Sequence, residues 1–193
     1  MESFSIYVTG VGGQGIGLLS EVLLRAADHA GHAVKSVDTH GLAQRGGIVV
    51  SQLRIGRSVY SPLIPAHAAD LAVALERYEA QRALHMALKD GGTLVYYDTV
   101  WQPLAVRLNE AAEVTAEQIA QECARRSVRL FHVHRPGLQD ARMQNIVILA
   151  HLQRHGLIHG LTADHYRRAM EDLLAGPTLE KNIALFDAER QAS

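Results

Sequence analysis

Two polar, glycine-rich segments contain the residues of this sequence that could bind a ligand. The first, GVGGQG, spans residues 10–15, and the second, DTHGLAQRGG, spans residues 38–47. In the first, Gly10, Gly12 and Gly15 satisfy the pattern G-x-G-x-x-G, in which backbone N–H groups bind a phosphate or a carboxylate. The second places an arginine, a histidine and a glutamine beside three glycines, a composition suited to an anion or to a closely approaching backbone.

The elements around the first segment are those that a phosphate-binding turn needs. Residues 4–9 are rich in β-forming types, and residues 16–31 have helical length with apolar residues on most faces. A second strand, predicted over 33–37, leads directly into the second segment. We therefore expect a right-handed βαβ unit, with both glycine-rich segments as neighbours at the carboxyl edge of a parallel sheet.

The rest of the chain predicts a Rossmann-like α/β fold: a mostly parallel sheet with an inserted antiparallel hairpin and a helical C-terminal third. The hairpin should pair residues 48–56 with 58–64 through a tight turn at Gly56 and Arg57. Further strands are expected at 70–76, 93–98 and 128–133, and helices at 77–92, 115–127, 145–156, 162–176 and 178–192.

Polar residues mark several of the predicted helix starts. Thr115 with Gln118 three positions later matches a capping box, and Thr162 and Thr178 are expected to be N-caps. We expect residues 1–193 to form a single domain, with the C-terminal helices from about 142 to 193 packing on the sheet or on a partner.

Composition excludes several classes of function. A formal net charge of −1 in 193 residues gives no general attraction to nucleic acid or to an anionic membrane. The start, MESFSIYVTG, has no basic region, and no apolar run approaches the roughly 20 residues of a membrane span. A soluble cytoplasmic protein is therefore expected. A single cysteine, Cys123, allows no internal disulfide and cannot supply the thiolates of an iron–sulfur cluster.

A dinucleotide site is one interpretation of the first segment. Asp38 lies 23 residues after Gly15, where such a site has a ribose-binding acid. Gly13 and Gly17 are not needed for that pattern, however, Gln14 lies at the crest of the turn, and a polar loop follows Asp38. A nicotinamide- or flavin-binding oxidoreductase and a nucleotide- or acyl-CoA-binding module stay open as alternatives, as does a purely structural role for the glycines in tight packing.

Three segments in order, GVGGQGIGLLSEVLLRAA, DTHGLAQRGGIVVSQLRIG and the asparagine-containing QNIVIL, resemble the gamma-type subunit of the 2-oxoacid:ferredoxin oxidoreductases. Within that family they are most similar to the small (beta) subunit of the indolepyruvate enzymes. The resemblance implies a large partner subunit that carries thiamine diphosphate, Mg²⁺ and [4Fe–4S] clusters, decarboxylates the 2-oxoacid and passes electrons to ferredoxin. The acyl group goes to coenzyme A, which the gamma-type subunit helps to enclose.

The resemblance implies a chain that binds no cofactor alone, has no catalytic residue and is inactive without its partner. We expect its two glycine-rich segments to form one surface for a coenzyme A phosphate or a carboxylate of the large subunit. The alternative for Arg45 is a solvated loop cation, and for Asn145 an N-cap. The expected surface consists of Gly10, Gly12, Gly13, Gln14, Gly15, Thr39, His40, Gln44, Arg45, Gly46, Gly47 and, from the resemblance, Asn145.

The histidines could suggest a metal site. His132 and His134 alternate on a predicted strand. His151, His155 and His159 follow at a spacing of four residues. Because no cysteine or carboxylate completes either set at ligand spacing, we expect scattered histidines and no metal.

Overall fold

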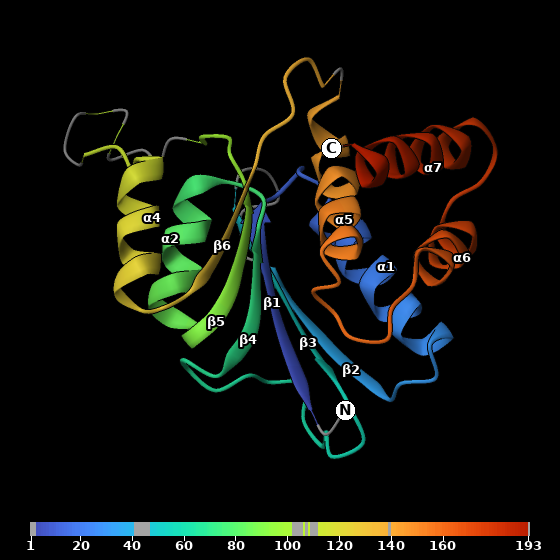
Figure 1. The fold of residues 1–193 in the computed structure, drawn as a ribbon, viewed down its shortest axis with the longest axis horizontal. Helices are drawn as coiled ribbons and strands as arrows, with labels where there is room; N and C mark the ends of the chain where they lie inside the picture. The colour runs from blue at the N-terminus through green and yellow to red at the C-terminus, as the bar shows by residue number, and fades with distance from the viewer. Residues whose placement is uncertain are drawn as a thin grey trace.

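The computed structural model describes residues 3–40, 47–101, 106, 108, 112–138 and 140–192. Figure 1 shows a central sheet with helices on both faces. The elements, in chain order, are β1 (Phe4–Val11), α1 (Ile16–His29), β2 (Val34–His40), β3 (Ile48–Ile55), β4 (Ala69–Ala74), α2 (Arg77–Met86), β5 (Leu88–Tyr97), α4 (Ala116–Arg125), β6 (Arg129–Val133), the 3-10 turn η1 (Ala141–Met143), α5 (Gln144–Arg154), α6 (Ala163–Leu173) and α7 (Gly176–Gln191).

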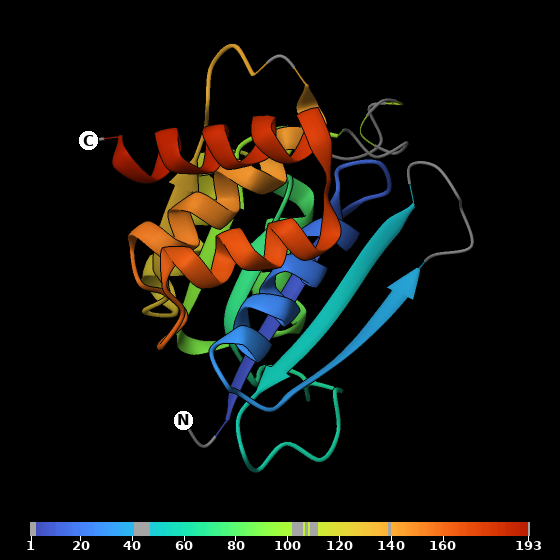
Figure 2. The same ribbon diagram turned by 90° about the vertical axis from the view of Figure 1, so that its right-hand side faces the viewer.

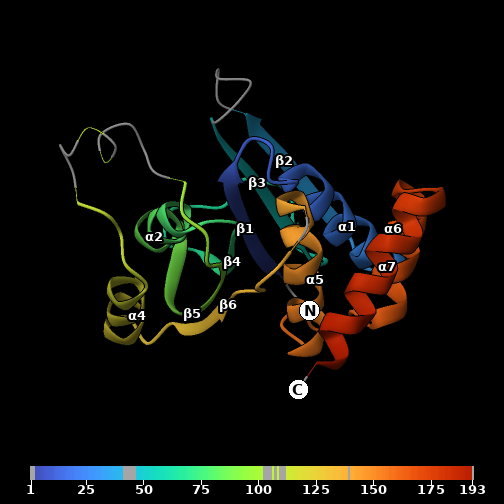
Figure 3. The same ribbon diagram turned by 90° about the horizontal axis from the view of Figure 1, so that it is seen from above.

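The sheet has six strands in the order β2-β3-β1-β4-β5-β6. Strands β1, β4, β5 and β6 pair in parallel, whereas β3 is antiparallel to both β1 and β2. Helices α2 and α4 cover one face over β4, β5 and β6, and α1 and α5 cover the other (Figures 1 and 3). This mixed α/β architecture confirms the predicted fold class.

The antiparallel hairpin differs from the prediction in its partners. Strand β3 pairs with β2 on one side, from Val34 opposite Ile55 to His40 opposite Val49, and with β1 on the other. Residues 58–64 form no strand. Strand β3 therefore pairs with the strand before it in the chain, as the adjacent β2 and β3 arrows illustrate in Figure 2. Strands β1 and β2 run in the same direction, as expected, but β3 lies between them.

Two other predicted boundaries are wrong. Residues 88–92 extend β5 instead of α2, because Leu88 pairs with Ala69 of β4, and cross-strand pairing outweighs local helical preference. Thr178 lies inside the first turn of α7, which begins at Gly176 after the N-cap residue Ala175. The capping box of Thr115 and Gln118 is confirmed, since each side chain bonds to the backbone N–H of the other.

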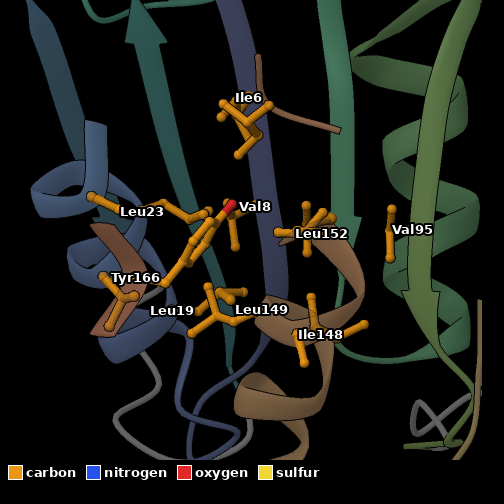
Figure 4. Packing of buried hydrophobic residues seen from close by; sticks show 14 of the residues in the cluster. Ile6, Val8, Leu19, Leu23, Val95, Ile148, Leu149, Leu152 and Tyr166 are labelled. Atoms are coloured by element: carbon orange, nitrogen blue, oxygen red, sulfur yellow. The ribbon is translucent and has the colours of Figure 1, made fainter. Parts of the chain in front are cut away.

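The larger core lies between the sheet and the helices α1 and α5. Ile6 and Val8 of β1 point into it, and Leu19 and Leu23 of α1 meet them there (Figure 4). Tyr166 of α6 is also buried in this core and stacks on Phe186 of α7, with ring centroids 5.7 Å apart. The helical C-terminal third thus shares one hydrophobic core with the sheet, α6 packing on α1 and α7 on α5.

Candidate functional site

The carboxyl ends of β1 and β4 form the topological switch point of the sheet. The helix after β1 covers one face and the helix after β4 covers the other, so the chain leaves these neighbouring strands in opposite directions (Figure 3). Ligands of open α/β sheets bind at such a point. The first glycine-rich segment follows β1 here, and Leu75 and Glu76 follow β4.

The glycines of the first segment have distinct structural roles. Gln14 donates its backbone N–H to the Val11 carbonyl over 3.1 Å, and Gly13 adopts the positive φ of 104° that this turn requires. A Cβ on Gly10 would lie 2.8 Å from the Gln14 Oε1 atom. Gly15 caps α1 at φ 80°, and a Cβ there would lie 2.5 Å from the Asn145 Nδ2 atom. Close packing therefore requires glycine at positions 10 and 15.

Gln14 bridges the switch point instead of pointing to solvent. Its Oε1 accepts the Val11 N–H over 2.8 Å, and its Nε2 donates to the Leu75 carbonyl over 3.2 Å. Gln144, at the start of α5, donates to the same carbonyl over 3.3 Å. Gln14 thus links the end of β1 to the end of β4, and Gln144 links the start of α5 to the same carbonyl.

The two glycine-rich segments are neighbours, as predicted. Gly12 donates its N–H to the Gly47 carbonyl over 2.9 Å. Thr39 and His40 belong to β2, which is longer than expected, and the Thr39 side chain is exposed. The remaining predicted residues of this segment, Gln44, Arg45 and Gly46, lie outside the described residues.

The position of Asp38 argues against a dinucleotide site. Asp38 pairs with Ser51 of β3, and β3 separates it from β1. Two strand spacings, about 9–10 Å, therefore lie between the ends of β1 and β2 in the plane of the sheet. In the dinucleotide fold these two strands are adjacent, so that the acid reaches the ribose of a nucleotide held at the glycine turn. Here Asp38 lies too far to the side for that role.

Asn145 joins α5 to the glycine turn across 130 positions of sequence. Its side chain is almost fully buried, and its Nδ2 donates to the Gly15 carbonyl over 3.1 Å. The N-cap interpretation is wrong, because α5 begins at Gln144 and Met143 is its N-cap residue. The expected polar contact near the glycine turn is present.

A cleft with a volume of 540 Å³ opens beside Gly15 and Asn145. Two cations contribute to it, Arg142 of η1 and Lys181 of α7. Arg142 also bonds to Asp140, with its Nη2 2.8 Å from Oδ2, and this contact lowers the pKa of that carboxyl to about 2. Of the residues that line this cleft, only Gly15 and Asn145 were predicted as site residues from the sequence. The full set is Gly15, Asn145, Leu18, Asp140, Arg142, Met143, Pro177, Thr178, Lys181 and Asn182.

Two carboxylates are buried on the other side of the turn. Glu79 accepts the Thr9 hydroxyl over 2.7 Å and the Arg82 Nε over 3.1 Å. Glu76 caps α2, accepting the backbone N–H of Tyr78 over 2.9 Å and that of Glu79 over 2.6 Å. Burial raises the pKa of the Glu76 carboxyl to about 7. The sequence signal for Glu76 is a carboxylate at the end of the apolar run from 71 to 75, which contains β4.

Among the described residues, no group of three histidine, cysteine, aspartate or glutamate side chains is arranged to hold a metal ion. The His132 Nε2 lies 2.7 Å from Asp98, and Cys123 is buried in the smaller core, where burial raises the pKa of its thiol to about 11. None of the helices in the described ranges is long and apolar enough to cross a membrane.

Comparison with known proteins places the chain in a family. The model of the family described as pyruvate ferredoxin/flavodoxin oxidoreductase matches residues 5–192. The indolepyruvate oxidoreductase subunit IorB of Archaeoglobus fulgidus is 32% identical, over 93% of this chain and 90% of the relative. Its counterpart from Pyrococcus horikoshii is 28% identical, over 97% of this chain and 94% of the relative.

Solved structures share the fold at low sequence identity. The keto/oxoacid ferredoxin oxidoreductase gamma subunit of Geobacter sulfurreducens is 17% identical, with a TM-score of 0.64 over 97% of this chain and 96% of that one. The 2-oxoglutarate:ferredoxin oxidoreductase of Magnetococcus marinus, solved with 2-oxoglutarate, coenzyme A and succinyl-CoA bound, is 19% identical. It aligns with a TM-score of 0.67 over 98% of this chain but only 31% of its own. Since the family match spans almost the whole sequence, the chain belongs to the pyruvate ferredoxin/flavodoxin oxidoreductase family.

Proposed function

We propose that this chain is the small, non-thiamine subunit of an indolepyruvate-type 2-oxoacid:ferredoxin oxidoreductase. The observation that carries the proposal is the near full-length similarity to two IorB subunits, together with the family match over residues 5–192. In this proposal a larger partner decarboxylates the aryl-pyruvate and passes the electrons to ferredoxin, and coenzyme A receives the acyl group.

The residues of this chain agree with such a division of labour. One cysteine cannot ligate a [4Fe–4S] cluster, which takes four thiolates, and Cys123 is buried in the core, where burial raises the pKa of its thiol. Thiamine diphosphate, Mg²⁺ and the clusters are therefore assigned to the partner. This chain contributes a surface at the switch point, in which Asn145 donates to the Gly15 carbonyl and both Gln14 and Gln144 donate to the Leu75 carbonyl.

Arg45 is the proposed point of contact between that surface and an anion. Arg45→Ala is expected to lower coenzyme A-dependent turnover, or the affinity of the chain for its large subunit, about tenfold, because a charge-assisted contact is lost. In the experiment the large subunit is titrated with wild-type or variant chain. The rate of indolepyruvate-dependent ferredoxin reduction is measured at each point of the titration.

Arg57→Ala is the matched control for this experiment. Arg57 is exposed and follows β3, which runs antiparallel to β1 and ends at the opposite edge of the sheet. Its replacement is expected to leave turnover and assembly unchanged. Wild-type turnover and assembly in Arg45→Ala would refute the role of Arg45.

A further inference from the structure

One half of the sheet has a face that no described helix covers. Helix α1 packs on β2 and β3 from one side, whereas α2, on the other side of the sheet, packs on β1, β4 and β5 (Figure 3). The α2 side of β2 and β3 is therefore left without a covering helix in the described part of the chain. We propose that this face, the outer face, docks an apolar surface flanked by carboxylates on the larger subunit, an inference that rests on the proposed function.

Alternation along the strands identifies the side chains of the outer face. Leu53 and Ile55 of β3 are buried in the core beneath α1, so the side chains between and before them point to the other side of the sheet. Residues directly opposite each other on paired strands share a face, which extends the set to β2. The outer face consists of Lys35 and Val37 of β2 and of Ile48, Val50 and Arg54 of β3.

The centre of the outer face is apolar, although a strand with one solvated face normally carries polar side chains there. Ile48 is 37% exposed, and Val50 is only partly buried. The segment after β3 borders this face, because the Arg54 Nη1 donates to the Ser61 carbonyl over 3.3 Å, and Tyr60 in that segment is 89% exposed. Exposed apolar side chains that gather in one place mark a surface for another protein, and tyrosine is enriched in such contacts.

Two like charges lie opposite each other on the outer face. Lys35 of β2 pairs with Arg54 of β3, and like charges at directly opposite positions destabilise a sheet. The Arg54 Nε donates to the Ser5 hydroxyl over 3.3 Å, which is a neutral partner. Neither cation forms an ion pair with a carboxylate in the described part of the chain. Carboxylates on a docked protein would neutralise both charges.

The extent of the outer face suits a protein better than a small anion. Ile48 and Arg54 lie six strand positions apart, a length of about 20 Å. A second copy of the chain is a poor occupant, because a two-fold contact places this surface against itself and brings its cations together. Ile48 directly follows Gly47, so the outer face adjoins the second glycine-rich segment, which is already proposed to contact the large subunit. The larger subunit is therefore the assigned occupant.

Charge reversal at Lys35 separates docking from folding. Lys35→Glu places a carboxylate opposite Arg54 and replaces a repulsion by an attraction, so the isolated chain should unfold at the same or a higher urea concentration. The same variant should bind the larger subunit at least about tenfold more weakly, because the partner's carboxylates then meet a like charge. Ile48→Glu should weaken binding to a similar degree, since it places a charge in the apolar centre.

The measurement uses the complex purified anaerobically with a labelled wild-type chain. Each unlabelled variant is added, and its ability to displace the labelled chain gives its relative affinity at low and at high salt. Rising salt should weaken the binding of the wild type more than that of Lys35→Glu. Arg168→Glu reverses an exposed cation of α6, which packs on α1 on the other side of the sheet, and as the matched control it should bind like the wild type.

The outcomes distinguish a failure of this inference from a failure of the proposed function. Displacement by Lys35→Glu and Ile48→Glu at wild-type concentrations overturns the docking face but leaves the subunit role in place. A wild-type chain that captures no larger subunit overturns the subunit role and the docking face with it. A wild-type chain that sediments alone as a dimer, which either variant dissociates, assigns the face to a second copy and overturns the larger subunit as its occupant.

Discussion

Replacing Gly15 by alanine is expected to destabilise the protein by about 3 kcal/mol, through backbone strain and the displacement of a buried amide. Gly15 has φ 80°, and its new Cβ would lie 2.5 Å from the Asn145 Nδ2 and 3.2 Å from the Arg142 carbonyl oxygen. Asn145 is buried, so it cannot swing away without losing its hydrogen bond to the Gly15 carbonyl. Urea unfolding monitored by circular dichroism measures the change.

Gly17→Ala is the matched control, two residues further along the same helix. A Cβ on Gly17 would meet no atom within 4 Å, and the position is helical. Alanine there should stabilise the protein by up to about 1 kcal/mol, because it reduces the conformational freedom of the unfolded chain. Equal effects of the two substitutions would show that the clash with Asn145 has no energetic weight.

Glu76→Gln is expected to remove a pH dependence of stability. Burial raises the pKa of Glu76 from an ordinary value of 4.5 to about 7, so the folded protein holds its proton more tightly than the unfolded chain does. The stability contribution of this proton is complete below pH 4.5 and is lost as the pH rises through 7. By linkage the loss is on the order of 3 kcal/mol at pH 8. Glutamine removes the charge but keeps only one of the two oxygens that cap α2, so the variant loses one of the two accepted N–H bonds at every pH. The stability of the variant should therefore lack the fall between pH 5 and 8 that the wild type shows.

Urea unfolding at pH 5, 6, 7 and 8 tests this expectation, with Glu180→Gln as the control for general charge effects. Glu180 is exposed on α7, and its replacement should leave the pH profile unchanged. Parallel profiles for wild type and Glu76→Gln across the whole range would mean that the buried carboxyl is ionised at little cost.

Features encoded over short stretches of sequence were predictable. The strand, glycine turn and helix at residues 4–31, and the capping box at Thr115 and Gln118, depend on neighbours within a few positions. The proximity of the two glycine-rich segments was also predicted, although the bond from Gly12 to Gly47 arises from the pairing of β1 with β3, which places Val11 opposite Ile48.

The place of β3 was not predictable from local pattern. An antiparallel strand from 48 to 55 could pair with the segment after it or with β2 before it, and both choices satisfy the alternation of its side chains. Insertion of β3 between β1 and β2 then depends on the burial of Leu53 and Ile55 beneath α1, a contact between distant parts of the chain. Because β3 lies between β1 and β2, Asp38 of β2 lies away from the glycine turn.

The cleft depended even more on tertiary structure. Lys181 and Asn182 lie in α7 with no motif around them, and the packing of α7 on α5 brings them beside Gly15. Asn145 was identified from resemblance, but its contact with the Gly15 carbonyl required the fold. Residues that complete a site from 130 positions away have no local signature.

The most direct test of the proposed subunit role is affinity purification of this chain under anaerobic conditions from the cell in which it occurs. We expect it to co-purify with a brown, larger subunit that contains iron, sulfide and thiamine diphosphate, and we expect the complex to reduce ferredoxin with indolepyruvate and coenzyme A. A colourless chain that purifies alone and reduces NAD would contradict it.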